Sequence, residues 1–285
     1  MHLYKTSQGN IIRVNETFYL VDENWDKLIN REGLLAHLQS YIKEATRISH
    51  HTGNQWLTDN LLPPIGSQEV WAAGVTYLRS RDARMEESED SGAADCYQRV
   101  YEAERPELFF KSLPHRVAGH REVVQIRKDS TWDVPEPELT LFINSSGHIQ
   151  GYTIGNDMSS RSIEGENPLY LPQAKMYERS AALGPCLWVI DQPISPETKI
   201  QIDIHRGGLK LFDDSTLLNR MKRSLTELVE WLFKEMDFSS GAFLMTGTCV
   251  VPPNDFTLME GDIVNITIEG IGSLTNTVGI KSSKK

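Results

Sequence analysis

Two closely spaced glutamates are the first residues in this sequence whose type and spacing suggest chemistry. Glu136 and Glu138 flank Pro137, and Pro135 precedes them. Each proline fixes its own φ angle and biases the preceding residue toward extended backbone, so both carboxylates point to the same side of the chain. Two such carboxylates repel each other unless a cation lies between them, and oxygen ligands favour Mg²⁺, Mn²⁺ or Ca²⁺ over Zn²⁺. The same spacing is also typical of an exposed acidic turn before a strand, and the spacing alone leaves both interpretations open.

Three further positions carry groups that could share a site with these glutamates. Asp157 ends a strand-like segment, where a side chain can leave the sheet and reach a cleft. Lys175 supplies an amine, and Gly247 with Thr248 forms a compact turn whose N–H and hydroxyl could bind an anion. Each has an ordinary alternative: a strand-end aspartate, a surface lysine and a common turn.

Strands must position most of these groups, and the sequence after residue 65 is rich in strand-like segments. Turn residues separate short strand-like segments, several of which alternate in period two, as Lys199–Ile204 does. This pattern predicts a rolled or sandwiched β architecture. The predicted strands are Glu69–Val75, Leu108–Ser112, Val123–Ile126, Leu139–Asn144, Tyr152–Asn156, Leu187–Ile190, Ile200–His205, Lys210–Phe212, Ala242–Met245, Ile263–Ile268 and Ser273–Ile280.

The clearest break in regular secondary structure is predicted at Leu62–Gly66, which contains two prolines and a glycine. We therefore predict a small N-terminal region over residues 1–65 and a larger domain over residues 66–285. The N-terminal region should hold a hairpin over Asn10–Val21 and an amphipathic helix over residues 34–45. In the larger domain, Ser224–Glu227 forms a capping box at the start of a helix.

Composition limits the class of protein. The 285 residues include 29 basic and 39 acidic side chains, a net charge of −10, without the basic patch that nucleic-acid binding requires. No stretch approaches the roughly 20 apolar residues of a membrane span, and Met1–Asn10 lacks the pattern of a signal peptide. The three cysteines stand far apart and form no CxxC pair. We expect a cytoplasmic protein that acts on a small molecule.

In combination, the motifs resemble the fumarylacetoacetate hydrolase family from about Ala72 to the C-terminus. The motifs that carry this resemblance occur in the family's order: Pro106–Lys111, Glu136-Pro137-Glu138, Ile154–Asp157, Lys175 before Leu183-Gly184-Pro185, and Thr246-Gly247-Thr248. The resemblance implies an α+β, mostly β fold, a mixed β-roll with a small N-terminal α/β region, assembled as a homodimer. It also implies Mg²⁺ held by Glu136, Glu138 and Asp157, with Mn²⁺ or Ca²⁺ as alternatives, an active-site lysine at Lys175, and contact of Thr248 with the substrate carboxylate.

One departure from the family points to a particular branch. Hydrolases of the family carry a His and a Glu that activate water just after the first core strand, and here Ser80 and Ala83 stand in their places. The stretch from Gly74 to Arg84 and the stretch from Ser160 to Lys175 instead look like the 2-keto-3-deoxy-sugar-acid dehydratases. This likeness implies Mg²⁺-dependent dehydration of a 2-keto-3-deoxy-pentonate to 2,5-dioxopentanoate and water.

The residue chemistry agrees with that reaction. A 2-oxo acid can chelate Mg²⁺, which acidifies the proton on C3, and a protein group must then remove this proton before the C4 hydroxyl leaves. Lys175 is the candidate for proton transfer or enolate stabilisation, and Glu107 is its candidate catalytic partner. The candidate substrate-binding residues are Thr248, Gly247, Lys111, Tyr77, Ser80 and Arg84.

The polar segment Arg79–Arg105 is expected to form a lid, with a solvated helix or loop as the alternative. Three other activities of the same scaffold remain open: acylpyruvate C–C hydrolysis, oxaloacetate decarboxylation and isomerisation of an oxo-diacid. A non-catalytic protein that binds 2-oxo acids is the alternative of another class.

Overall fold

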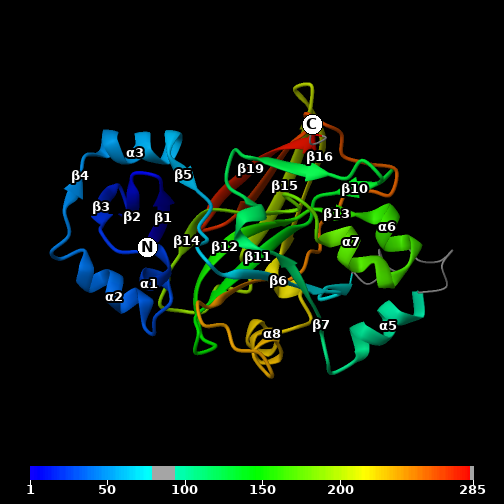
Figure 1. Ribbon diagram of the computed structural model, residues 1–285, viewed down its shortest axis with the longest axis horizontal. Helices are drawn as coiled ribbons and strands as arrows, with labels where there is room; N and C mark the ends of the chain where they lie inside the picture. Colours follow the sequence, from blue (N-terminus) through cyan, green and yellow to red (C-terminus); the bar gives the residue numbers. More distant parts are fainter. Residues whose placement is uncertain (79–93, 283–285) are drawn as a thin grey trace.

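The computed structural model describes residues 1–78 and 94–282, and it shows a mostly β protein (Figure 1). Within these residues, none of the helices combines the length and the apolar character that crossing a bilayer requires. The predicted site residues Ser80 and Arg84 lie outside the described residues, as does most of the predicted lid.

A twelve-stranded mixed sheet runs through the whole molecule. Its strands are β1 (His2–Thr6), β2 (Gly9–Val14), β3 (Thr17–Val21), β4 (Arg47–Ile48), β5 (Leu61–Leu62), β6 (Glu69–Gly74), β7 (Glu107–Ser112), β8 (Val117–Ala118), β11 (Pro137–Ile143), β12 (Ile149–Asp157), β14 (Ala181–Trp188) and β17 (Ala242–Met245). The main path is β4-β3-β2-β1-β14-β12-β11-β17-β6-β7, with β5 beside β1 and β8 beside β14. Most neighbours are antiparallel, whereas β17 runs parallel to β6 and β14 runs parallel to β8.

A second sheet of five strands packs against one face of the first. It has the order β16-β15-β18-β19-β9 and consists of β9 (Val123–Ile126), β15 (Lys199–Arg206), β16 (Leu209–Leu217), β18 (Ile263–Ile268) and β19 (Gly272–Ile280). Alternate residues of β11, such as Leu139 and Leu141, join Ile202 and Ile266 of the second sheet in one buried cluster. A small third sheet pairs β10 (Asp133–Val134) with β13 (Ser159–Ser160).

The opposite face of the large sheet has a second apolar cluster, to which Phe142 and Phe243 contribute. Near the N-terminus this cluster includes α1 (Trp25–Ile29) and α2 (Leu34–Tyr41), while α3 (His50–Asp59) follows β4. These elements form the blue lobe in Figure 1. Among the described residues, the other helices are α5 (Ala94–Glu102), α6 (Arg161–Glu166), α7 (Leu171–Lys175) and α8 (Leu225–Leu232), with 3₁₀ turns at Pro114–Arg116, Pro168–Tyr170 and Leu218–Arg220.

Most of the predicted elements are confirmed. The hairpin of β2 and β3 is present, and the Ser224 hydroxyl and the Glu227 carboxylate make both hydrogen bonds of the capping box. The strand predicted to begin at Leu187 is β14, which begins at Ala181. Pro185 lies inside this strand, where a proline is unusual, and the pairing of β12 with β14 is irregular beside it. The boundary at residues 65 and 66 stays a prediction, since β1 pairs with β14 and the sheet is continuous across it.

Candidate active site

Three carboxylates meet where β11 and β12 lie side by side. Glu136, Glu138 and Asp157 are each at most 3% exposed, and one oxygen from each lies within 4.8 Å of the others. The antiparallel register explains this proximity: Glu138 pairs with Gly155, and the Asp157 N–H donates to the Glu136 carbonyl at 3.0 Å. The acidic pair is therefore not an exposed turn, and the expected same-side arrangement of the two glutamates is present.

A tight turn at Gly247 holds the carboxylate of Glu138. The Gly247 N–H donates to its Oε2 at 2.6 Å, and Gly247 has a φ of +97°, which favours glycine. The Thr76 hydroxyl packs under this turn and donates to the Thr246 carbonyl at 2.7 Å. Gly247 thus orients a carboxylate, so its N–H is not free for the substrate anion that the sequence suggested.

Lys175 lies at the end of α7 and is fully buried. Its Nζ donates to Glu136 Oε2 at 2.5 Å, to Ser159 Oγ at 2.5 Å and to Asp157 Oδ2 at 3.2 Å. The structure therefore brings the predicted lysine onto two of the three predicted metal ligands.

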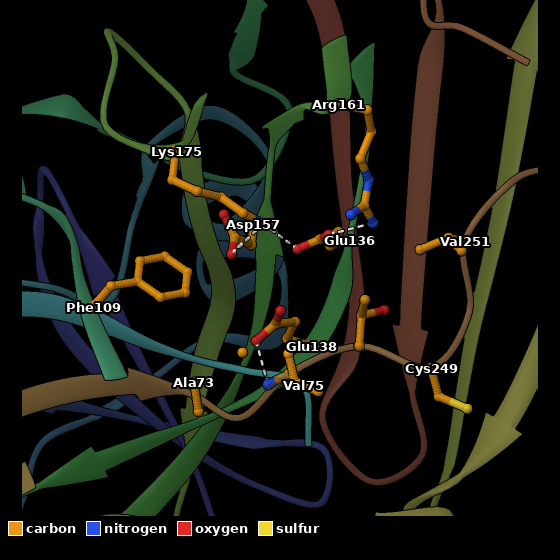
Figure 2. A pocket seen from close by; sticks show the side chains of 13 residues that line it. Ala73, Val75, Phe109, Glu136, Glu138, Asp157, Arg161, Lys175, Cys249 and Val251 are labelled. Carbon is orange, nitrogen blue, oxygen red and sulfur yellow. Dashed lines mark hydrogen bonds and ion pairs between the residues drawn. The ribbon is translucent and has the colours of Figure 1, made fainter. Parts of the chain in front are cut away.

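Arg161 was not among the predicted site residues, although it lines the site. Its Nη2 donates to Glu136 Oε1 at 2.6 Å, and its Nη1 donates to the buried Glu164 at 3.2 Å. Figure 2 shows Arg161 and Lys175 approaching Glu136 from different sides. A signal was available in the sequence, because Arg161 and Ser159 follow Asp157 closely in a short stretch of small polar residues.

Lys111 takes a position behind the carboxylates. It is 1% exposed, its Nζ lies 2.5 Å from Asp157 Oδ1, and it also donates to the carbonyls of Met158 and Lys175. Because it does not reach the surface of the pocket, its geometry does not fit the predicted contact with substrate. Tyr77 is likewise buried and is not a lining residue, and burial raises the pKa of its hydroxyl.

A narrow pocket opens over the three carboxylates and combines polar and apolar walls (Figure 2). Glu107 does not line it, but the Glu107 carboxylate packs against Gly74, which does. Thr248 lines the pocket, and its contact with the substrate carboxylate stays a prediction. The lining residues are Ala73, Gly74, Val75, Phe109, Glu136, Glu138, Asp157, Arg161, Lys175, Gly247, Thr248, Cys249 and Val251.

The electrostatics of the site favour a bound cation. Burial raises the pKa of Glu138 well above its usual range, and the charges of Asp157 and Glu136 raise it further. Burial also lowers the pKa of Lys111. Three buried carboxylates with converging oxygens are a donor set that suits a hard divalent cation, which would relieve their mutual repulsion.

Known proteins with similar sequences and folds provide independent evidence. Residues 70–279 match the fumarylacetoacetate hydrolase C-terminal domain. The probable 2-keto-3-deoxyxylonate dehydratase of Haloferax volcanii is 49% identical over 216 residues, which cover 75% of this chain and 73% of the relative. The 2-dehydro-3-deoxy-D-arabinonate dehydratase of Saccharolobus solfataricus is 42% identical over 217 residues, with the same coverage. A solved 2-keto-3-deoxy-D-arabinonate dehydratase, complexed with magnesium and 2,5-dioxopentanoate, has a TM-score of 0.82 and 33% identity over 99% of each chain.

Proposed function

The chain belongs to the fumarylacetoacetate hydrolase family, and we propose that it removes water from a 2-keto-3-deoxy-pentonate with Mg²⁺ as its cofactor. The observation that carries this function is the buried set of Glu136, Glu138 and Asp157 with Lys175 Nζ against two of them. The enzyme is a metal-dependent hydro-lyase, and its product is 2,5-dioxopentanoate.

The names of the two dehydratase relatives are consistent with one substrate. Xylonate and arabinonate of the same series differ at C2 and C3, whereas a 2-keto-3-deoxy acid has a ketone at C2 and a methylene at C3. Only the stereocentre at C4 remains, so the two names describe the same pentonate within one series. We therefore infer a five-carbon substrate with a hydroxyl at C4.

The reaction balances without any further reactant. Loss of one C3 hydrogen and the C4 hydroxyl releases water and leaves a C3–C4 double bond. Two hydrogens then shift from C5 and its hydroxyl to C3 and C4, which produces the aldehyde of 2,5-dioxopentanoate. When bound, Mg²⁺ polarises the keto group and thereby acidifies the C3 hydrogen.

The chain's own residues supply binding, proton transfer and exclusion of water. Glu136, Glu138 and Asp157 would hold the cation, and the position of Thr248 on the pocket wall supports its proposed contact with the substrate. We assign proton transfer to Lys175 Nζ, and we keep Glu107 as its candidate partner because the Glu107 carboxylate packs against the lining residue Gly74. Phe109, Val75 and Val251 contribute apolar wall, which limits the access of water.

Hydrolysis of an acylpyruvate would need a group that activates water. Ser80 and Ala83 replace the His and Glu that serve this purpose in the hydrolases of the family. An enolate with a hydroxyl at C4 eliminates water without an external nucleophile, so dehydration does not need the missing pair. This difference favours dehydration over C–C hydrolysis.

Product analysis tests the reaction type. With saturating Mg²⁺, we expect kcat/KM on a 2-keto-3-deoxy-pentonate to exceed that on acetylpyruvate by a wide margin, with 2,5-dioxopentanoate as the product. Two carbon fragments would indicate hydrolysis, and CO₂ would indicate decarboxylation. Preference for acetylpyruvate, or no turnover of any 2-oxo acid, would contradict the proposal.

We also propose that the protein is a cytoplasmic homodimer. Support for the dimer comes from β16, an edge strand of the five-stranded sheet with exposed Leu209 and Leu211, which a second copy could cover. Light scattering should give about twice the 32.3 kDa mass of one chain, and the mass of one chain at micromolar concentration would contradict the dimer.

The free thiols of Cys186 and Cys249 support a location in the cytoplasm, which is a reducing compartment, and cell fractionation tests this location.

A further inference from the structure

Lys111 makes three contacts that join two parts of the site. Its Nζ lies 2.5 Å from Asp157 Oδ1, and it donates to the Met158 carbonyl at 2.9 Å and to the Lys175 carbonyl at 2.6 Å. Two of the three N–H donors of the ammonium group bond to these carbonyls, while the contact with the Asp157 carboxylate is an ion pair. One buried cation from β7 therefore contacts both the end of β12 and the end of α7.

The Lys175 segment needs such support because α7 has only five residues. Within this short helix the cap N–H of Met176 bonds to the Pro172 carbonyl, which leaves the last carbonyls to find other partners. Lys111 and the Ser180 hydroxyl both donate to the Lys175 carbonyl, at 2.6 Å and 2.8 Å. Tertiary donors, rather than the helix itself, thus fix the backbone from which the Lys175 amine extends.

Asp157 depends on the same group. Lys111 takes Oδ1, while Oδ2 faces Lys175 Nζ at 3.2 Å. Glu138 and Glu136 have equivalent partners in the Gly247 N–H and in Arg161, so each carboxylate has one oxygen fixed by a donor other than Lys175. Only Lys111 among these donors also contacts the backbone of Lys175.

Resting on the function proposed above, we propose that Lys111 is a positioning residue that couples the metal ligand Asp157 to the proton-transfer group Lys175. It contacts neither substrate nor the reacting atoms. Its removal disturbs two properties together: the affinity for the divalent cation, through Asp157, and turnover with the metal saturating, through Lys175. A buried lysine with a merely structural role would change neither property in the folded enzyme.

The decisive variant is Lys111→Met, which keeps the length of the side chain and removes its donors. We expect Mn²⁺ binding, measured by electron paramagnetic resonance without substrate, to weaken about 10- to 100-fold, the usual effect of losing a partner of a metal ligand. We also expect kcat at saturating metal to fall at least about tenfold, with a smaller change in KM. Mn²⁺ affinity and kcat within about twofold of wild type would overturn the proposal.

Two variants control for loss of stability alone. Lys5→Met removes another lysine that donates to a backbone carbonyl, that of Ile65, and should lower stability without changing Mn²⁺ affinity or kcat. Ser180→Ala removes the second donor to the Lys175 carbonyl and spares Asp157, so it should lower kcat with Mn²⁺ affinity unchanged. Equal losses of Mn²⁺ affinity in Ser180→Ala and Lys111→Met would contradict the coupling.

If Lys111→Met does not fold, Lys111→Arg provides the same test. It retains the charge, but its planar fork does not match the positions of the one carboxylate and two carbonyls that surround the Lys111 ammonium group. We expect a folded enzyme with lowered kcat at saturating metal, and wild-type values of kcat and Mn²⁺ affinity would overturn the proposal. Because Mn²⁺ binding needs no substrate, wild-type protein that binds Mn²⁺ but does not turn over the pentonate would contradict the proposed function and leave the role of Lys111 in Mn²⁺ binding standing.

Discussion

The first 65 residues and the rest of the chain contribute to one continuous sheet, yet they bury different kinds of side chain. Among residues 1–65, the buried polar side chains are those of Thr6 and Asn10, and no charged side chain is buried. The described part after residue 65 buries Lys111, Asp133, Glu136, Glu138, Asp157, Arg161, Glu164, Lys175, Arg223 and Asp262. Since burying charge is unfavourable unless it is paired, this contrast separates a region that stabilises the fold from one that does chemistry.

The largest effect on stability should come from residues 1–65, which we call the apolar region. Trp25 of α1 is 4% exposed and packs in the same cluster as Leu28 and Leu34. Trp25→Ala leaves a large cavity there, so the free energy of unfolding should fall by about 3–5 kcal/mol. Urea unfolding measures this loss. The folded variant should keep its kcat/KM, and a fall of more than about tenfold would show that this region also shapes the site.

The largest effect on activity should come from the described part of the chain after residue 65, which we call the charged region. Lys175→Ala removes the amine that contacts Glu136 and Asp157, so kcat/KM at saturating Mg²⁺ should fall at least about 10²-fold, or about 2.7 kcal/mol. Lys199→Ala, at an exposed position of β15, is the matched control and should leave the steady-state kinetics unchanged. Activity of Lys175→Ala within tenfold of wild type would remove Lys175 from the proton transfer.

The contrast between regions also determines what the sequence could predict. The capping box of α8 depends on residues three positions apart, and the carboxylates of Glu136 and Glu138 depend on local extended backbone, so both were predictable. Lys111 is predicted to bind substrate, whereas its burial depends on the distant segments that end in Asp157 and Lys175. Nothing local in the sequence specifies such contacts.

Two elements without a prediction have weak local patterns. β1 pairs along its length with the next strand, β2, but its five residues do not alternate regularly between apolar and polar side chains, and α3 has few apolar residues. Arg161 is one of several polar residues that follow Asp157 in the sequence, and its role follows from Glu136 and Glu164, both of which accept hydrogen bonds from its guanidinium group. Sequence patterns predicted the elements well and predicted the outer partners of the site poorly.

Removal of the metal should change activity, which depends on the charged region, and should leave the apolar region unaffected. EDTA should abolish activity, and Mg²⁺ or Mn²⁺ should restore it, because the three carboxylates are the proposed ligands. Glu138→Gln keeps the side-chain volume and weakens one contact to the cation, so Mg²⁺ affinity by calorimetry should fall at least about tenfold, or about 1.4 kcal/mol. The melting temperature without metal should not fall. Full activity after exhaustive chelation would contradict the metal assignment.

The smallest predicted effect concerns a buried charge outside the ligand set. Asp133 of β10 is 2% exposed, and burial raises its pKa from 3.8 to about 6. The unfolded chain therefore releases this proton near pH 4, whereas the folded protein keeps it until about pH 6. For an acid whose pKa is raised by folding, stability declines as the pH rises through this window and stays lower above it.

Asp133→Asn removes this ionisable group and keeps a polar side chain of similar size. The variant should therefore gain stability relative to wild type as the pH rises, with the difference in unfolding free energy about 1 kcal/mol larger at pH 7 than at pH 5. Urea unfolding of both proteins at the two pH values measures this difference, and the curves of Trp25→Ala and wild type should stay parallel over the same range. A constant difference between Asp133→Asn and wild type would mean that the carboxyl of Asp133 ionises normally, and that this part of the charged region carries its charge without a cost to stability.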